Sequence, residues 1–185
     1  NVDQEMFSLY QNNKSENFSD TAHRNSVAQA TRLMSGWGLK FFDYDNDGLV
    51  DAILSNGHPD DMIEQYSTQV KYKEPLLLFR NEGGKLRDVS KGAGPAFEKS
   101  YPARGLAVGD IDNDGRLDVL ISNNGMAPEL LKNVAGAGHH WLGLTLQGTG
   151  CNRDAIGAKI TWSFGGQTRT RLKNAGGSYL SSHDP

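Results

Sequence analysis

Two nine-residue segments concentrate carboxylates at a spacing that suits a metal ion. They read "DYDNDGLVD" (43–51) and "DIDNDGRLD" (110–118). In each segment aspartates stand at positions 1, 3, 5 and 9, and glycine stands at position 6. We expect Gly48 and Gly115 to supply the sharp turn of each loop, because the left-handed conformation costs little only for glycine. Left alone, carboxylates this close along the chain repel one another, and a bound cation turns that repulsion into attraction. The residue types and their spacing therefore predict cation binding.

Calcium fits this ligand pattern best. Ca²⁺ takes about six to eight oxygen ligands, and alternate residues of a curled loop turn their carboxylates inward. Position 7 offers no useful side-chain oxygen, so its backbone carbonyl is the expected ligand. We predict two Ca²⁺ sites, the first formed by Asp43, Asp45, Asp47, Leu49 and Asp51, and the second by Asp110, Asp112, Asp114, Arg116 and Asp118.

An EF-hand, a site for a different metal and a simple turn all fit the acidic segments less well. An EF-hand loop begins in the same way but needs an acidic residue at position 12 and a helix on each side. Position 12 here is Leu54 or Ile121, and the flanks are typical of strands, so each loop is expected to close inside a β-hairpin. Mg²⁺ prefers fewer protein ligands, and Zn²⁺ favours His or Cys, which neither loop contains. A simple Asn-Asp-Gly turn is the remaining alternative, but it does not explain Asp at positions 1, 3 and 9 in both loops.

The acidic loops belong to an internal repeat with a period of about 67 residues. "GLKFFDYDNDGLVDAILSNG" (38–57) matches "GLAVGDIDNDGRLDVLISNNG" (105–125). "LYQNNKSENFSDTA" (9–22) resembles "LFRNEGGKLRDVS" (78–90), whose opening returns as "LLKN" (130–133). Short apolar runs rich in β-branched residues, bounded by Gly, Asn and Asp, predict strands on both sides of each acidic loop.

Three further segments complete the expected organisation of the chain. Residues 25–34 are the best helical candidate, and residues 58–75 form an insertion in the first unit. After residue 133 the acidic repeat ends, and alternating patterns predict strands at 141–146, 158–164 and 168–173. We place the domain boundary so that residues 1–134 hold the repeats and residues 135–185 form a separate β segment.

Composition limits the class of protein. The chain has 185 residues, a net charge of -3 and a single cysteine, so an intrachain disulfide is excluded. No window approaches the roughly 18 apolar residues of a membrane span. Because the chain starts at Asn1 without Met, we expect a piece of a longer protein. Sequons begin at Asn13 and Asn17, and would carry glycans in a secreted eukaryotic protein or stand there by chance.

No group of residues outside the acidic loops predicts catalysis. His139 and His140 are adjacent, so they do not readily share one face of a strand. Cys151 has no evident partner base. The basic residues of "TRTRLK" (168–173) fall on one strand face, where a solvated surface is favoured over a nucleic-acid or other polyanion contact.

At these motifs the chain resembles two known families. The D-x-D-x-D-G-x-x-D hairpin, inside a repeat that ends in "LFRN", resembles the FG-GAP/VCBS repeat of integrin α-subunit propellers and of many secreted bacterial propellers. The segment "HHWLGLTLQGTGCNRDAIGAKITWSFGG" with "GGSYLSSHDP" resembles the start of the ASPIC/UnbV domain of cartilage acidic protein and its bacterial relatives. Propellers typically close with about four to eight blades, and this chain holds about two. The Phe-Gly-Leu-Gly element expected after "SSHDP" is also absent.

The resemblance implies an all-β fold with about two incomplete propeller-type blades and a small β-sandwich-like C-terminal segment. It also implies a secreted or cell-surface calcium-binding protein without catalytic residues, acting in adhesion, matrix contact or self-assembly. The expected partners are other proteins or copies of itself, with a homo-oligomer or filament as one form, and no nucleic acid. Two alternatives stay open: part of a secreted propeller enzyme, and a calcium-dependent glycan-binding module.

Overall fold

Short antiparallel sheets make up most of the regular secondary structure, as predicted for an all-β protein. The computed structural model describes residue 2, residues 4–14 and residues 16–183. The strands are β1 (Tyr10–Asn12), β2 (Phe18–Asp20), β3 (Gly36–Phe42), β4 (Asp51–Asn56), β5 (Glu74–Pro75), β6 (Leu77–Asn81), β7 (Leu86–Asp88), β8 (Ser100–Tyr101), β9 (Ala103–Gly109), β10 (Asp118–Asn123), β11 (Met126–Leu131), β12 (Lys159–Phe164) and β13 (Gln167–Leu172). The helical pieces are η1 (Ala22–Arg24), α1 (Val27–Thr31), η2 (Ile63–Gln65) and η3 (Pro95–Glu98).

The first repeat unit forms a four-stranded antiparallel sheet of order β3-β4-β6-β7. β3 and β4 make the predicted hairpin around the first acidic loop, with Phe42 opposite Asp51 at its mouth. Every residue of β4 is buried, which is expected of a strand covered on both faces. The apolar run that follows the first acidic loop is therefore the centre of this sheet.

The second repeat unit forms a matching sheet of order β11-β10-β9. Its β9–β10 hairpin carries the second acidic loop, with Gly109 opposite Asp118. In the second sheet Leu120 of β10 lies between Ala107 of β9 and Leu130 of β11. In the first sheet Ile53 of β4 lies in the same way between Lys40 of β3 and Leu78 of β6. The sequence repeat is thus also a repeat of strand register.

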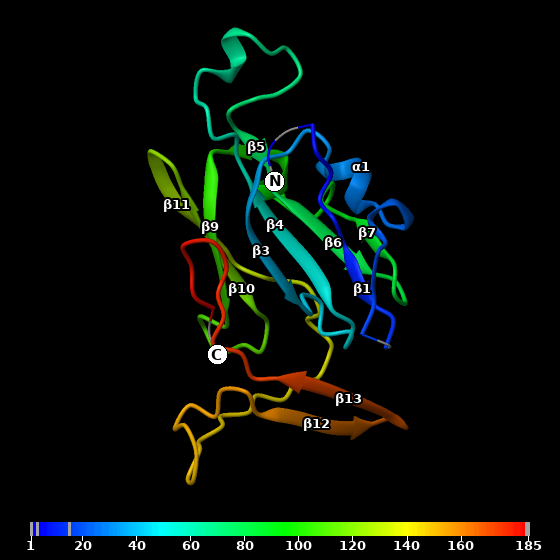
Figure 1. Ribbon diagram of the computed structural model, residues 1–185. Coiled ribbons are helices and arrows are strands. Elements are labelled where there is room, and N and C mark those ends of the chain that lie inside the picture. The colour runs from blue at the N-terminus through cyan, green and yellow to red at the C-terminus, as the bar shows by residue number, and fades with distance from the viewer. Residues whose placement is uncertain (1, 3, 15, 184–185) are drawn as a thin grey trace.

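The two sheets pack face to face around the larger hydrophobic core (Figure 1). Ile53 and Leu78 of the first sheet meet Leu106 and Ile121 of the second, and none of these side chains is more than 5% exposed. Burying a side chain of this kind contributes about 1.5–3 kcal/mol. Packing of one sheet against the other therefore fixes the relative position of the two acidic loops.

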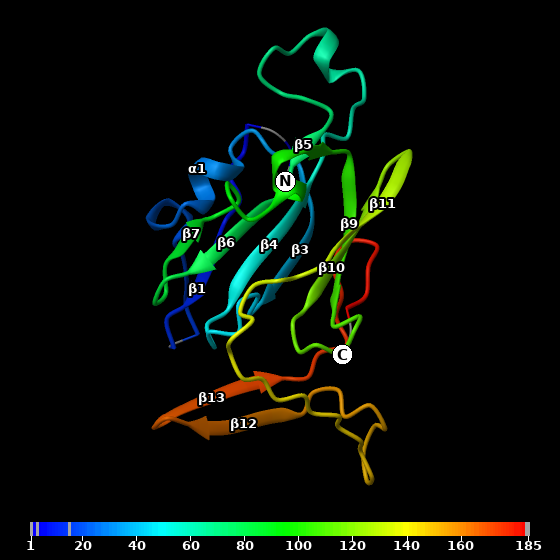
Figure 2. The same cartoon turned by 180° about the vertical axis from the view of Figure 1, so that it is seen from behind.

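The opposite face of the first sheet is covered by the N-terminal segment, seen from behind in Figure 2. There Leu54 and Phe79 pack in a second core with Val27 and Ala28 of α1. α1 has five residues, so it is shorter than the helical candidate at 25–34. The β1–β2 hairpin lies in this segment and matches the predicted likeness of residues 9–22 to the β6–β7 hairpin.

Two surface features complete the repeat region. The insertion at residues 58–75 projects beyond the sheets as a loop whose helical part is η2 (cyan in Figure 1). Asn17 of the second sequon is exposed, whereas Ser15 of the first sequon lies outside the described residues. Among the described residues, no helix is long and apolar enough to cross a membrane.

The C-terminal segment contributes one hairpin, β12–β13, which lies beyond the ends of the sheets that carry the acidic loops (Figures 1 and 2). The strand predicted at 141–146 is wrong, because these described residues pair with no neighbouring strand. Leu142 is 75% exposed and Leu144 53% exposed, so the alternating pattern has no core to cover. The boundary placed after residue 134 stays a prediction.

Candidate metal-binding loops

Both acidic loops follow the same backbone path. Gly48 and Gly115 have φ values of 85° and 82°, as predicted for the sharp turn at position 6. Asn46 and Asn113 are also left-handed, with φ values of 55° and 57°. Asparagine tolerates this region because its short polar side chain bonds locally. The turn therefore depends on the asparagine at position 4 as well as on the glycine that the sequence pattern predicts.

The first aspartate of each loop closes the turn from inside. Asp43 accepts hydrogen bonds from the N–H groups of Asp47 and Gly48, at 3.1 and 2.7 Å. Asp110 accepts the equivalent bonds from Asp114 and Gly115, at 3.0 and 2.8 Å. The hydrogen bonds to the aspartate at position 1 therefore hold each loop in its turn without a bound ion.

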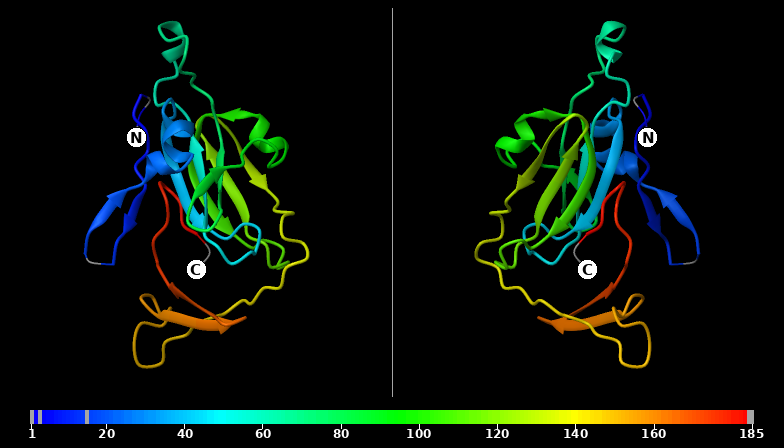
Figure 3. Two further views of the ribbon diagram at one scale, coloured as in Figure 1. Left: turned by 90° about the vertical axis from the view of Figure 1, so that its right-hand side faces the viewer. Right: turned by 90° about the vertical axis from the view of Figure 1, so that its left-hand side faces the viewer.

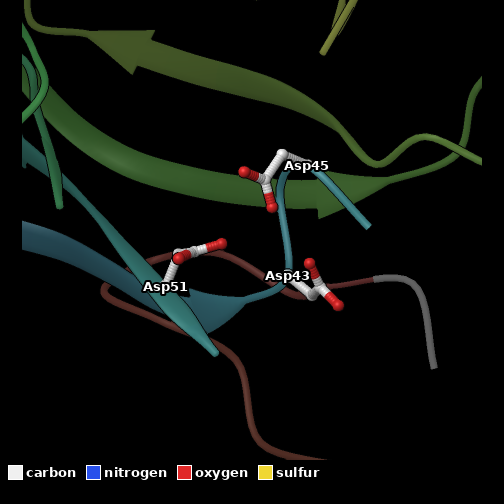
Figure 4. Close-up of side chains that lie close together, drawn as sticks. All are labelled: Asp43, Asp45 and Asp51. Carbon is white, nitrogen blue, oxygen red and sulfur yellow. The ribbon is translucent and has the colours of Figure 1, made fainter. Parts of the chain in front are cut away.

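The first loop gathers Asp43, Asp45 and Asp51, whose ligand oxygens lie within 4.8 Å of one another (Figure 4). Asp43 and Asp45 come from the loop after β3, and Asp51 begins β4. Asp45 and Asp51 are buried. Burial raises the pKa of Asp51 to about 6, although N–H groups of Asn81 and Tyr44 donate to this carboxylate. The ionised carboxylate of Asp51 is thus poorly solvated.

The second loop gathers Asp110, Asp112 and Asp114 within the same distance of one another. This cluster is more exposed and already carries counter-charges. Lys132 pairs with Asp112 and lowers its pKa, and Arg116 pairs with Asp114. The two loops therefore share a motif but differ in electrostatic environment.

Two predicted ligands stand outside these clusters. Asp47 accepts from the N–H of Leu49 at 2.7 Å and from Arg80 at 3.3 Å. Asp118 accepts from the N–H groups of Ile111 and Asn133, at 3.2 and 2.8 Å. The carbonyls of Leu49 and Arg116 are not part of the clusters either, and the ligand roles of all ten predicted residues stay predictions.

Sequence analysis missed the basic residues that face the loops. Arg80 lies 2.9 Å from Asp45 and 3.3 Å from Asp47, and Lys132 faces the second loop in the same way. Asn81 and Asn133 follow these residues, and their N–H groups donate to Asp51 and Asp118 at 2.8 Å. The signal was present in the repeated "LFRN" and "LLKN", which align a basic residue and an asparagine in both units.

The two loops also contact each other. Asn46 of the first loop donates to the carbonyl of Gly115 in the second at 3.0 Å. Asn133, whose N–H holds Asp118, donates through its side chain to the carbonyl of Tyr44 at 2.7 Å. A chain of hydrogen bonds therefore runs from one candidate site to the other.

The C-terminal segment lies against both loops. His139 Nδ1 is 2.7 Å from the carbonyl oxygen of Asp45, which gives this histidine a structural place beside the first loop. A side chain at Gly48 would meet the guanidinium of Arg169, and one at Gly115 would meet the indole of Trp141. Arg169 is half-buried, so the predicted solvated face does not describe this residue.

Comparison with protein families agrees with this arrangement. Residues 59–121 match the FG-GAP-like repeat, and residues 148–185 match ASPIC and UnbV. The chain joins an FG-GAP-like repeat to an ASPIC and UnbV domain. The FG-GAP-like match contains the second acidic loop, and the first loop lies in the preceding copy of the same unit. No curated protein matches the chain.

FG-GAP-like repeats and ASPIC and UnbV domains are typical of extracellular and cell-surface proteins, and they are generally non-catalytic. The chain is therefore a repeat protein of the extracellular type. Its two acidic clusters have the geometry and the oxygen donors to hold a metal ion.

Proposed function

We propose that this chain is an extracellular calcium-binding structural protein, in which Ca²⁺ rigidifies two β-hairpin loops for contact with other proteins or with copies of itself. The observation that carries the proposal is the cluster of Asp43, Asp45 and Asp51, in which Asp45 and Asp51 are buried and Asp43 is half-buried. Arg80 pairs with Asp45, which leaves the other two carboxylates without a basic partner among the described residues. Burying charge without a partner is unfavourable, and burial raises the pKa of Asp51 and of Asp43. A divalent cation neutralises these carboxylates where they stand.

The donor set favours calcium over other ions. Carboxylate and carbonyl oxygens are the ligands of hard cations, and neither cluster contains the His or Cys that Zn²⁺ favours. Asp43, Asp45 and Asp51 would hold one ion, and Asp110, Asp112 and Asp114 the other, with the remaining predicted ligands completing each site. The bound ion supplies the positive charge that keeps each hairpin closed.

Extracellular calcium is sufficient for such sites to matter. Extracellular modules bind Ca²⁺ with Kd of the order of 10⁻⁴–10⁻³ M. With Kd at ~10⁻⁴ M and Ca²⁺ at ~1 mM, each site adds about 1.4 kcal/mol to the free energy of unfolding. Two sites then contribute a sizeable part of a domain stability of about 5–15 kcal/mol.

Exposed leucines on the outer face of the second sheet support the proposal that a second copy of the chain packs there. Leu120 and Leu130 lie side by side on this face and are 44% and 55% exposed. Their counterparts in the first sheet, Ile53 and Leu78, are 1% and 5% exposed because the second sheet covers them. The proposed occupant of the outer face is a repeat sheet of a second copy of this chain.

Calorimetric titration with Ca²⁺ tests the metal sites. We expect two bound ions in the unaltered chain and one in either Asp45→Ala or Asp112→Ala. Asp61→Ala, an exposed change in the insertion, is the control and should keep both. Unchanged stoichiometry in the two loop variants would overturn the ligand assignment, and equal melting temperatures in Ca²⁺ and EGTA would overturn the structural role.

A further inference from the structure

The end of the chain folds back onto the open edges of both sheets (Figure 3). Ser178 Oγ accepts a hydrogen bond from the N–H of Leu39 in β3 at 2.7 Å. His183 Nδ1 accepts one from the N–H of Val108 in β9 at 3.2 Å. Residues 178–183 therefore join the β12–β13 hairpin to both repeat units.

Two neighbouring cavities lie between this segment, β3 and the β12–β13 hairpin. Their volumes are about 550 and 250 Å³. Lys40, Lys173 and His183 line both, so the cavities share one polar wall. The larger volume falls within the range of about 300–1,000 Å³ that is typical of small-molecule sites.

The shared wall carries positive charge that no acidic group of the described residues balances. Lys40 and Lys173 are half-buried, and neither ammonium group pairs with an acidic residue in the described parts of the chain. No Asp or Glu from those parts lines either cavity. Burial lowers the pKa of Lys40, and burial together with the charge of Lys40 lowers the pKa of His183. An anion would relieve this repulsion.

His183 lies in the same wall and has a buried ring nitrogen without a partner among the described residues. Since its Nδ1 accepts from Val108, the neutral ring carries its proton on Nε2. This Nε2 is buried and finds no hydrogen-bond partner among the described residues. A buried donor left unpaired is unfavourable, and an anionic oxygen is the partner that suits it.

Apolar side chains also line the two cavities and are partly exposed. Leu39 and Phe41 line the larger cavity and are 43% and 46% exposed. Leu144 and Leu172 line the smaller cavity and are 53% and 59% exposed. A ligand with an apolar portion would remove this surface from water, which is favourable.

We propose that the paired cavities bind a small organic carboxylate with an apolar tail. The carboxylate lies between Lys40 and Lys173 and accepts from His183, and the tail covers the leucines and Phe41. This site is separate from the acidic loops and does not depend on calcium in them.

Titration of the isotope-labelled full chain with octanoate, followed by amide NMR, tests the proposal. We expect saturable shifts at Gly176 and Gly177, which line the larger cavity, and Kd at least tenfold higher for acetate. The double variant Lys40→Gln/Lys173→Gln should raise the octanoate Kd at least tenfold. Lys85→Gln/Lys159→Gln removes the same charge from exposed positions outside the cavities and should leave Kd unchanged.

Three results would overturn the proposal. The absence of saturable shifts would show that octanoate does not bind at the cavities. The same octanoate Kd in Lys40→Gln/Lys173→Gln and in Lys85→Gln/Lys159→Gln would show that the two cavity lysines do not hold the carboxylate. Equal Kd values for acetate and octanoate would show that the apolar side chains of the cavities do not contact the tail. Lys40→Met/Lys173→Met removes the same charges but keeps the aliphatic part of each side chain, so it should preserve the packing. Its melting temperature shows whether a loss of binding comes from a folding defect. Octanoate should still bind Asp45→Ala/Asp112→Ala, so that failure of calcium binding and failure of this site are distinguished.

Discussion

At the scale of residues, the two acidic loops use one motif in two electrostatic settings. Asp51 is fully buried, and Arg80 is the one basic side chain among the described residues that forms an ion pair with the first cluster. Asp112 is exposed and pairs with Lys132, while Arg116 pairs with Asp114 in the same loop. The first cluster therefore has the greater need of a cation, and we expect it to bind Ca²⁺ more tightly than the second.

Arg80 and Lys132 compete with a cation for the carboxylates they face. Removing Arg80 as Arg80→Gln should raise the Ca²⁺ affinity of the first site by about two- to fivefold, because partly exposed ion pairs contribute up to about 1 kcal/mol. Arg87→Gln is the control, since Arg87 pairs with Glu82 instead. Calorimetric titration gives both values. Weaker binding in Arg80→Gln would instead mean that Arg80 helps to build the site.

The buried Asp51 predicts a pH dependence. Its pKa in the folded, ion-free protein is about 6, above the unfolded value of about 3.9. The folded state therefore binds an extra proton between these values, and its stability falls as the pH rises through about 6. Ca²⁺ favours the ionised carboxylate and opposes that loss.

The rise in melting temperature caused by Ca²⁺ should consequently be larger at pH ~7.5 than at pH ~5. Thermal unfolding with Ca²⁺ and with EGTA at the two pH values measures it. Asp51→Asn should reduce the ion-free pH dependence around pH 6. A calcium effect of the same size at both pH values would contradict the role given to Asp51.

At the scale of elements, the β3–β4 and β9–β10 hairpins hold their loops against each other. The bond from Asn46 to Gly115 and the bond from Asn133 to Tyr44 cross between them. An ion that orders one loop thereby restrains a hydrogen-bond partner of the other. Such coupling between sites is typically about 1–3 kcal/mol, or roughly 5–150-fold in affinity.

We therefore expect positive cooperativity between the two Ca²⁺ sites, measured by calorimetric titration. Asn46→Ala removes one of the two hydrogen bonds between the loops and should reduce this cooperativity. Asn113→Ala is a matched control, because Asn113 holds the same position and left-handed conformation in the second loop, so both variants carry a similar backbone cost. Independent sites in the unaltered chain, or equal loss of cooperativity in both variants, would contradict the coupling.

At the scale of the whole molecule, the sheets form an open stack. The second sheet covers one face of the first, the N-terminal segment covers the other, and the outer face of the second sheet keeps Leu120 and Leu130 exposed. Exposed apolar surface on a repeat unit is the usual place for the next unit to pack. The C-terminal segment then ties the loop ends and strand edges of both sheets together (Figures 1 and 3).

Self-association through this outer face is testable by light scattering. Leu120→Lys/Leu130→Lys should lower the average mass of the calcium-bound protein, because charge on the face opposes burial. Leu142→Lys/Leu180→Lys adds the same charge at exposed positions of the C-terminal segment and should leave the mass unchanged. A monomer in the unaltered chain at all concentrations would rule out a second copy as the occupant.

The sequence by itself determined the local parts of this protein. Spacing within nine residues predicted the acidic loops, their hairpins and the turns at Gly48 and Gly115, because these depend on neighbouring residues. The period of about 67 residues identified matching units, and strand register confirmed them. Pattern alone failed at residues 141–146, because a strand needs a partner edge that no pattern supplies.

The tertiary structure decided what lies beside each loop. It placed Asp43, Asp45 and Asp51 together and turned Asp47 toward the N–H of Leu49, since carboxylates in one loop separate according to their hydrogen-bond partners. It also brought Lys40 and Lys173, far apart along the chain, to one cavity wall. Contacts between residues that are distant in sequence depend on how the sheets pack and on where the C-terminal segment folds back onto them. The spacing of residues along the chain does not encode either.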